Sequence, residues 1–176
     1  KGIETDRVEI LDLNNIEKAI KPNTKLIYLE ALSNPQLKLA DIPAIADLAH
    51  KHGLKFIVDN TFLSPVVMRP LELGADMVVH SGTKYYVGHG DALCGIVAGR
   101  KEDIDRVRYY YDNFGSHISP FNAWLALRSV RTMQLRVERQ CQNAMTLAKW
   151  FEKRPEVEFV TYPGLESHGQ HEIDKK

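Results

Sequence analysis

The chain has 176 residues, of which 44% are hydrophobic and 26% are charged, and its 23 Lys and Arg residues balance 23 Asp and Glu residues. This composition is typical of a soluble globular protein of about one domain, and it excludes a disordered or collagen-like chain. There is no excess of positive charge, no apolar run of about 18 residues and no apolar signal-peptide core. We therefore expect neither a nucleic-acid nor a membrane partner, and a cytoplasmic location.

Short apolar runs alternate with helical patterns over the first two thirds of the chain. Aliphatic and β-branched residues predict strands at 8–13, 25–30, 55–59, 77–80 and 93–98. Capping residues and apolar spacing predict helices at 15–21, 41–53 and 102–108, and a short helical turn at 70–74. Because parallel strands need crossover connections, we expect an α/β fold whose mostly parallel sheet is covered on both faces.

A long helix is predicted after the sheet. Ser119 is a favourable N-cap, Pro120 suits the first helical position, and neither Gly nor Pro interrupts 121–154 before Pro155. Residues 156–161 alternate like a strand. The expected organisation is a first domain, one connecting helix and the start of a second domain, at 1–118, 119–153 and 154–176.

The cysteines and histidines do not form a recognisable metal site. Cys94 and Cys141 make no C-x-x-C pair, and the seven histidines match no zinc-ligand spacing. Nothing near either cysteine in the sequence is suited to lowering a thiol pKa. We therefore expect both cysteines to be small buried hydrophobes and expect no metal ion.

Polar residues suited to chemistry follow two of the predicted strands. Asp59 ends one strand, and His-Ser-Gly-Thr-Lys-Tyr at 80–85 follows the next. In open α/β sheets ligands bind outside the carboxyl ends of the strands, so Asp59 and the turn from Ser81 to Lys84 are expected to face one crevice. An aspartate in this position also commonly caps a turn, and a lysine is commonly a solvated surface residue.

Three motifs compete for this stretch. Gly-His-Gly at 88–90 begins like a dinucleotide-binding G-x-G-x-x-G, but the next glycine, Gly95, comes two places late. Ser-x-x-Lys at 81–84 fits the motif of acyl-serine β-lactamases, yet no K-T-G follows and Gly82 predicts a loop. The third motif is a pyridoxal phosphate site, which needs a Schiff-base lysine, hydroxyl groups for the phosphate and an acid for the pyridine nitrogen. All three parts are present.

Several segments resemble one family. Val-Asp-Asn-Thr at 58–61, Leu-Gly-Ala-Asp at 73–76 and Gly-His-Gly-Asp at 88–91, together with the lysine segment, are similar to the Cys/Met metabolism pyridoxal phosphate enzymes. Ser-Asn-Pro at 33–35 and Tyr-Pro-Gly-Leu at 162–165 extend the resemblance over nearly the whole chain.

The resemblance implies a fold and a role for each site residue. Residues 1–118 are expected to be part of the large cofactor-binding domain of fold type I, and 154–176 the start of the smaller C-terminal α/β domain. Lys84 is expected to hold pyridoxal 5'-phosphate as a Schiff base and to move protons on the substrate. Asp59 is expected to keep the pyridine nitrogen protonated. The other implied cofactor ligands are Ser81 and Thr83, for the phosphate, and Asn34, near the phenolic oxygen.

The resemblance also implies a small sulfur amino acid as the substrate. The segments at 39–42, 69–74 and 139–144 favour γ-elimination of L-methionine or a related substrate to a thiol, 2-oxobutanoate and ammonia. The alternatives are the cystathionine γ-lyase and β-lyase reactions, and γ-replacement as in cystathionine γ-synthase or O-acetylhomoserine sulfhydrylase. Family members are usually homotetramers of active dimers, so a homotetramer is expected.

Family members carry regions that this sequence does not match. These regions precede the segment matching Lys1 and follow the one matching Lys176, and they include part of the phosphate site and the carboxylate-binding arginine. We therefore expect an incomplete piece of the enzyme that is inactive alone. A function of another class stays open, namely a non-catalytic cofactor-binding or interaction fragment with an exposed apolar face.

Overall fold

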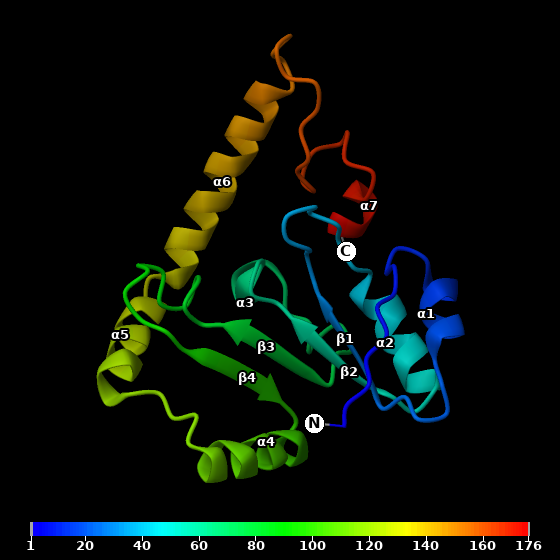
Figure 1. Ribbon diagram of the computed structural model, residues 1–176. Coiled ribbons are helices and arrows are strands. Elements are labelled where there is room, and N and C mark those ends of the chain that lie inside the picture. Colours follow the sequence, from blue (N-terminus) through cyan, green and yellow to red (C-terminus); the bar gives the residue numbers. More distant parts are fainter. Residues whose placement is uncertain (1, 176) are drawn as a thin grey trace.

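A four-stranded sheet forms the centre of the protein in the computed structural model, which describes residues 2–175 (Figure 1). β1 pairs with β2 and β2 with β3 in parallel, whereas β4 pairs antiparallel with β3. The α/β fold with a mostly parallel sheet is therefore confirmed. In spatial order the strands are β1 (Leu26–Glu30), β2 (Lys55–Asp59), β3 (Met77–Ser81) and β4 (Gly95–Gly99).

The register of the parallel strands brings their carboxyl ends to one edge of the sheet. Glu30, the last residue of β1, pairs with Asp59, and Asp59 pairs with Val79 of β3. Ser81 ends β3 two residues beyond Val79. The residues that follow these three strands are therefore neighbours in space, as the sequence predicted.

Helices cover one face of the sheet. α2 (Ile42–Lys51) begins after Asp41, whose carboxylate accepts a 3.4 Å hydrogen bond from the Ala44 N–H. α1 (Leu13–Ala19) lies beside α2 (Figure 1). The buried cluster between these helices and the strands includes Ile16, Ile45, Ala49, Phe56 and Val58.

The other face of the sheet is partly open. Leu26, Tyr28 and Val97 are exposed apolar or aromatic side chains on the edge strands β1 and β4. The expected covering of both faces is thus incomplete within residues 2–175. No helix in this range is long and apolar enough to cross a membrane.

The second half of the chain is helical, but the helix predicted over 119–153 is two helices. They are α5 (Pro120–Val130) and α6 (Met133–Phe151). At the break, both the backbone N–H and the hydroxyl of Thr132 donate to the Ser129 carbonyl, at 3.1 and 3.2 Å. Such a local hydrogen bond from a threonine side chain competes with the regular helical ladder. We call residues 129–132 the elbow.

Other predicted elements also differ from the structure. No strand forms at 8–13 or at 156–161, because no neighbouring strand is present to pair with either segment in the described part of the chain. Val8 and Ile10 instead pack against the core as irregular chain. The segment at 70–74, by contrast, is a hydrogen-bonded turn as predicted. Helices that complete the structure are α3 (Ser64–Val67), α4 (Lys101–Phe114) and α7 (His171–Asp174).

A charged cluster lies at the start of β2, opposite the carboxyl edge. Lys55 Nζ lies 2.8 Å from Asp103 Oδ2 and 3.6 Å from Asp76 Oδ1. Asp76 is buried, and its Oδ2 accepts hydrogen bonds from the Phe56 N–H at 2.8 Å and from His50 Nε2 at 3.1 Å. Burial opposes ionisation of Asp76, but these two donors and Lys55 together lower its pKa.

Candidate functional site

Lys84 lies in a tight turn directly after β3. Its backbone N–H donates to the Ser81 carbonyl at 3.1 Å, and its own carbonyl accepts from the Gly88 N–H at 2.7 Å. A third bond joins the Val87 N–H to the Gly82 carbonyl at 2.9 Å. The side chain of Lys84 is exposed and makes no ion pair within residues 2–175. The turn therefore fixes the backbone of Lys84 and leaves its amine available.

Gly82 allows this turn to pack closely against the chain that leads into β4. A Cβ atom on Gly82 would lie 2.4 Å from Cys94 Sγ, a separation that real Cβ atoms do not show. The Gly82 N–H donates to the Cys94 carbonyl at 2.8 Å, and the Cys94 N–H donates to Thr83 Oγ1 at 3.4 Å. The Thr83 hydroxyl predicted to hold a phosphate thus accepts one backbone N–H, that of Cys94.

The Asp59 carboxylate is oriented from two sides. Its Oδ1 accepts a 2.9 Å hydrogen bond from the Thr61 N–H, and its Oδ2 accepts a 3.2 Å hydrogen bond from the Tyr28 hydroxyl. Thr61 Oγ1 in turn accepts the Ser81 N–H at 2.7 Å. Thr61 therefore connects Asp59 at the end of β2 with Ser81 at the start of the lysine turn.

Asn60, between Asp59 and Thr61, has a different task. Its side chain is fully buried, and its Nδ2 donates to the carbonyls of Ser64 and Met68 at 3.1 and 2.8 Å. These bonds hold the loop that contains α3 against the end of β2. Of these three consecutive residues, Asp59 supplies the carboxylate, Asn60 anchors the loop, and Thr61 joins the two strand ends.

Burial and charge shift the pKa values of three side chains around the site. The pKa of Tyr28 is raised by partial burial and by the negative charge of Asp59, which also accepts its hydrogen bond. Burial lowers the pKa of His80, so this imidazole is neutral at pH 7. The Tyr86 ring lies edge-on to His80, with centroids 5.1 Å apart, and burial raises its pKa. His80 and Tyr86 are thus two uncharged side chains that pack against each other close to Lys84 in the sequence.

Asn34 is placed less closely than the other predicted site residues. It is exposed in the loop after β1, and its backbone N–H donates to Glu30 Oε2 at 3.3 Å. Within residues 2–175 no hydrogen bond joins it to Asp59 or to Lys84. Asn34 shares the carboxyl edge with the other site residues but not their hydrogen-bond network.

Both cysteines are half-buried and unpaired, and burial raises their pKa values. A raised thiol pKa leaves little thiolate at neutral pH. The prediction that Cys94 and Cys141 pack as small hydrophobes agrees with these surroundings.

Sequence reasoning assigned no role to three residues that shape the site. Tyr28 could have been noticed, since strand alternation places it on the same face as Glu30 and Asp59. Thr61 could also have been noticed, because it stands two residues after Asp59, where its side chain can reach the end of the neighbouring strand. Arg136 gave no local signal, because it contacts the lysine turn from α6.

The geometry meets the needs of a pyridoxal phosphate group. An amine without an ionic partner among residues 2–175 and two hydroxyls lie at one turn, and a carboxylate held in a fixed orientation lies at the next strand end. The chemistry of this donor set fits an aldehyde, a phosphate and a pyridine nitrogen, respectively. A helix-like nucleophile turn of the β-lactamase kind is absent at 81–84.

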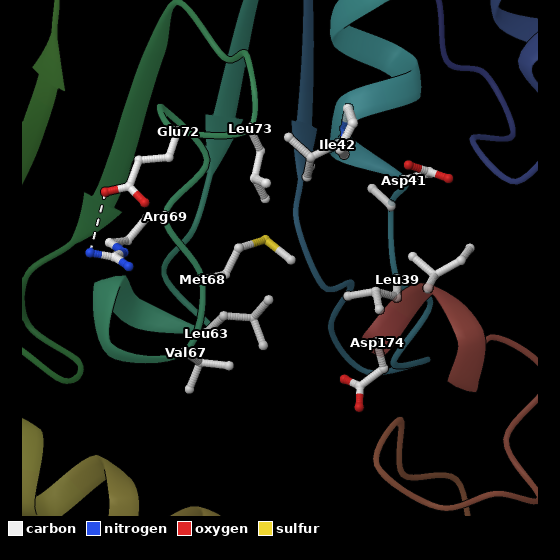
Figure 2. A pocket seen from close by; sticks show the side chains of 13 residues that line it. Leu39, Asp41, Ile42, Leu63, Val67, Met68, Arg69, Glu72, Leu73 and Asp174 are labelled. Atoms are coloured by element: carbon white, nitrogen blue, oxygen red, sulfur yellow. Dashed lines mark ion pairs between the residues drawn. The ribbon is translucent and has the colours of Figure 1, made fainter. Parts of the chain in front are cut away.

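A separate apolar groove lies away from these residues (Figure 2). Leu39 and Ile42 line one wall, Met68 and Leu73 line the other, and Asp174 of α7 lies at its end. The Leu39 N–H donates to Gln170 Oε1 at 3.0 Å, which holds the segment before α7 beside the groove. None of the five predicted site residues lines it.

Comparison with known proteins decides the family. The sequence profile of the Cys/Met metabolism PLP-dependent enzymes matches residues 1–176. The chain belongs to this family. Enzymes of this family depend on pyridoxal phosphate, so the cofactor predicted from the lysine turn is confirmed at the level of the family.

Several members of the family are close relatives of the chain. L-Methionine gamma-lyase of Porphyromonas gingivalis is 48% identical over 178 residues, which cover 99% of this chain and 45% of the relative. Cystathionine gamma-synthase of Haemophilus influenzae is 49% identical over 149 residues, or 84% and 40%. The crystal structure of cystathionine gamma-lyase from Lactobacillus plantarum, complexed with L-serine, matches with a TM-score of 0.93 and 38% identity over 97% of this chain and 45% of that one. The chain thus spans just under half the length of these relatives.

Proposed function

We propose that this chain carries the cofactor-binding centre of a pyridoxal-phosphate-dependent lyase of sulfur amino acid metabolism. The observation that carries the proposal is the connected path from the Asp59 carboxylate through Thr61 to Ser81 and the turn of Lys84. This path connects the Asp59 carboxylate to the backbone of Lys84 by hydrogen bonds. When bound, pyridoxal phosphate supplies an electron sink for negative charge at the substrate α-carbon.

Lys84 is the catalytic residue in this proposal. Its Nζ would hold the cofactor covalently, be released when the substrate amine takes its place, and then accept the α-proton and a β-proton of the substrate. Both the N–H and the carbonyl of Lys84 are engaged in the turn, so its amine moves by side-chain rotation. The absence of an ionic partner among the described residues keeps the amine available for proton transfer.

Asp59 would bind the protonated pyridine nitrogen. The Thr61 N–H and the Tyr28 hydroxyl already hold the carboxylate in one orientation, which reduces the cost of ordering it when the nitrogen binds. A carboxylate next to a pyridine nitrogen favours the protonated, electron-withdrawing form of the ring. The hydroxyls of Ser81 and Thr83 would donate to the phosphate, and Asn34 would lie near the phenolic oxygen.

The substrate in this proposal is L-methionine or a related sulfur amino acid, cleaved by γ-elimination to a thiol, 2-oxobutanoate and ammonia. Several relatives named L-methionine gamma-lyase, at 43 to 48% identity, support this reaction. Relatives named cystathionine beta-lyase and cystathionine gamma-synthase support the alternatives, β-elimination and γ-replacement.

The proposal extends to assembly and location, namely a homotetramer in the cytoplasm. Exposed aromatic and aliphatic side chains gather on α4 and α5, among them Tyr110, Phe114, Phe121 and Leu127, and such surfaces favour association. Sedimentation of the protein expressed from its complete coding sequence tests the assembly. A monomer at all concentrations contradicts it.

Covalent trapping tests the catalytic assignment. The protein expressed from its complete coding sequence is incubated with pyridoxal phosphate, reduced with borohydride and digested for peptide mass spectrometry. We expect the cofactor mass on Lys84, none in Lys84→Ala, and normal labelling in the control Lys149→Ala, an exposed lysine on α6. Labelling of another lysine in the wild type contradicts the site.

Product analysis then tests the reaction. Unreduced protein that has been incubated with pyridoxal phosphate is supplied separately with L-methionine and with cystathionine, and 2-oxobutanoate, thiol and ammonia are measured. Release of all three from L-methionine supports γ-elimination, whereas turnover of cystathionine alone selects one of the other family reactions. Trapping at Lys84 without turnover of L-methionine, of cystathionine or of an O-acylhomoserine supplied with a thiol indicates the non-catalytic cofactor-binding role.

A further inference from the structure

The elbow between α5 and α6 contacts the turn that carries Lys84. Ser129 Oγ lies 3.4 Å from His89 Nδ1, which itself bonds to the Val87 carbonyl at 2.7 Å. Ser129 is buried at this contact. The break in the predicted long helix therefore places polar groups against the far end of the lysine turn.

Arg136, one turn into α6, spans the elbow and the lysine turn. Its Nη2 donates to the Tyr85 carbonyl at 3.0 Å and to the Ser129 carbonyl at 3.1 Å. Its Nε donates to Thr132 Oγ1 at 3.2 Å. The Tyr85 carbonyl belongs to the residue directly after Lys84, and it lies 51 positions before Arg136 in the sequence. One guanidinium thus fixes the peptide next to the reactive lysine to a distant helix.

Gly88 makes room for this guanidinium. Its φ is +75°, and a Cβ atom there would lie 2.1 Å from Arg136 Nη1. The Nη1 atom is buried and has no hydrogen-bond partner within residues 2–175. An unpaired buried donor lowers stability, and an apolar side chain would fill the same space without that cost. The guanidinium is therefore better explained by the geometry it imposes than by its contribution to stability.

We propose that Arg136 is a positioning residue for Lys84, a role that rests on the proposed function. By holding the Tyr85 carbonyl, it sets the orientation of the Lys84 backbone and hence the volume that the lysine amine can reach. Local hydrogen bonds hold the Lys84 N–H and carbonyl, but within 2–175 only Arg136 holds the following carbonyl to another element. Without the Arg136 guanidinium, the Tyr85 carbonyl loses this bond, and the turn can move at the residue after Lys84.

The test compares Arg136→Met, which keeps the volume of the stem but removes the donors, with Arg139→Met as the matched control. Arg139 is an exposed arginine on the same helix. Each variant is expressed from the complete coding sequence. The readouts are the rate of borohydride trapping on Lys84, the pH titration of the visible absorbance of the bound cofactor, and thermal unfolding.

We expect trapping on Lys84 to slow by about 10- to 100-fold in Arg136→Met, since a displacement of about 1 Å has an effect of this size on a positioned group. The midpoint pH of the absorbance titration is expected to shift, because the Lys84 amine would no longer be held in a single surrounding. Arg139→Met is expected to match the wild type. Trapping and titration equal to the wild type in a folded Arg136→Met overturn the proposal.

A second variant covers failure to fold. Arg136→Lys keeps the stem and the charge, but a single ammonium cannot reproduce the planar fork that reaches two carbonyls. We expect native thermal unfolding with slowed trapping. Wild-type trapping and kcat in Arg136→Lys, if Arg136→Met does not fold, overturn the positioning role.

The two proposals fail in different ways. If wild-type protein carries no cofactor on Lys84, the proposed function fails, whatever the variants do. If the wild type is labelled on Lys84 and both Arg136 variants behave like it, only the positioning role fails. A fall in kcat with little change in KM for the accepted substrate adds support, because Arg136 itself faces the turn rather than the substrate.

Discussion

The Tyr28 hydroxyl, on β1, donates a 3.2 Å hydrogen bond to Asp59 Oδ2, on the neighbouring strand β2. The parallel register pairs Glu30 with Asp59, so Tyr28 lies two residues earlier on the same face. One hydrogen bond therefore joins the two side chains at the edge where the cofactor is proposed to bind. Their electrostatic coupling is directly measurable.

Replacing Asp59 with Asn is expected to lower the pKa of Tyr28. Burial raises that pKa first, and the negative charge of Asp59 raises it further, so only the second contribution is lost. Ultraviolet titration of the tyrosines, with Tyr28→Phe subtracted in each background, isolates this one phenol. Equal Tyr28 titrations in the wild-type and Asp59→Asn backgrounds contradict the coupling.

Replacing Gly82 with Ala is expected to destabilise the protein by about 1–3 kcal/mol and to slow labelling of Lys84. The added methyl group collides with Cys94 Sγ, so the lysine turn must move away from the chain entering β4. Gly95→Ala is the control, because no atom lies within 4 Å of a Cβ there. Urea unfolding and borohydride trapping measure the two effects.

A third variant separates the collision from other effects of the methyl group. In Gly82→Ala with Cys94→Ala, the sulfur is absent, and most of the lost labelling is expected to return. Labelling that stays as low as in Gly82→Ala alone shows that the collision with the Cys94 sulfur is not the cause.

Stability is expected to fall in acid partly through Asp76. Its folded-state pKa is lowered below the ordinary value, so the stability it contributes is fully present above its unfolded pKa of about 3.9. That contribution is lost as the pH falls through the folded-state pKa. Urea unfolding between pH 5 and pH 3 is therefore expected to lose more stability in the wild type than in Asp76→Asn.

The same variant has a cost at neutral pH. Asp76→Asn removes the charge that accepts from the Phe56 N–H and His50, and we expect a loss of about 2 kcal/mol at pH 7. Asp112→Asn, an exposed aspartate on α4, is the control and is expected to change neither quantity. Parallel acid curves for wild type and Asp76→Asn would remove Asp76 from the acid response.

Phe56→Ala is expected to cost about 3–5 kcal/mol, since this side chain of β2 is fully buried in the core. Phe159→Ala is the matched control, because that ring is 77% exposed, and we expect a change within about 0.5 kcal/mol. Denaturant unfolding measures both. Equal losses in the two variants contradict the core described here.

The sequence was sufficient to predict that Asp59 and the lysine turn lie at one edge of the sheet, because the strand ends depend on local signals. The strand at 55–59 has the predicted bounds, so Asp59 lies at a strand end as expected. The strand that ends at Ser81 also precedes a glycine-bearing turn. Parallel strands bring their ends together at one edge, so these two predictions were enough to bring Asp59 near the lysine turn.

Features that depend on distant contacts could not be predicted in the same way. No Gly or Pro marks the elbow. A threonine such as Thr132 also occurs within helices, so the sequence does not reveal that its hydroxyl bonds to the Ser129 carbonyl at a break. The segment at 8–13 has the composition of a strand, but a strand also needs a neighbour with free hydrogen-bonding groups. Arg136 acts on residues far away in sequence, so no local pattern reveals it.

The antiparallel pairing of β3 with β4 has a consequence for the motion of the lysine. Ser81 and Gly95 are direct partners in that pairing, so 82–94 leaves and rejoins the sheet at adjacent positions, roughly one strand spacing of 4.8 Å apart. The segment is a loop whose two ends are held together by the strand pairing. This pairing fixes the two ends of 82–94 relative to each other. In the proposed function, cofactor and substrate would therefore exchange at the Lys84 amine by side-chain movement, with the backbone of the turn in place.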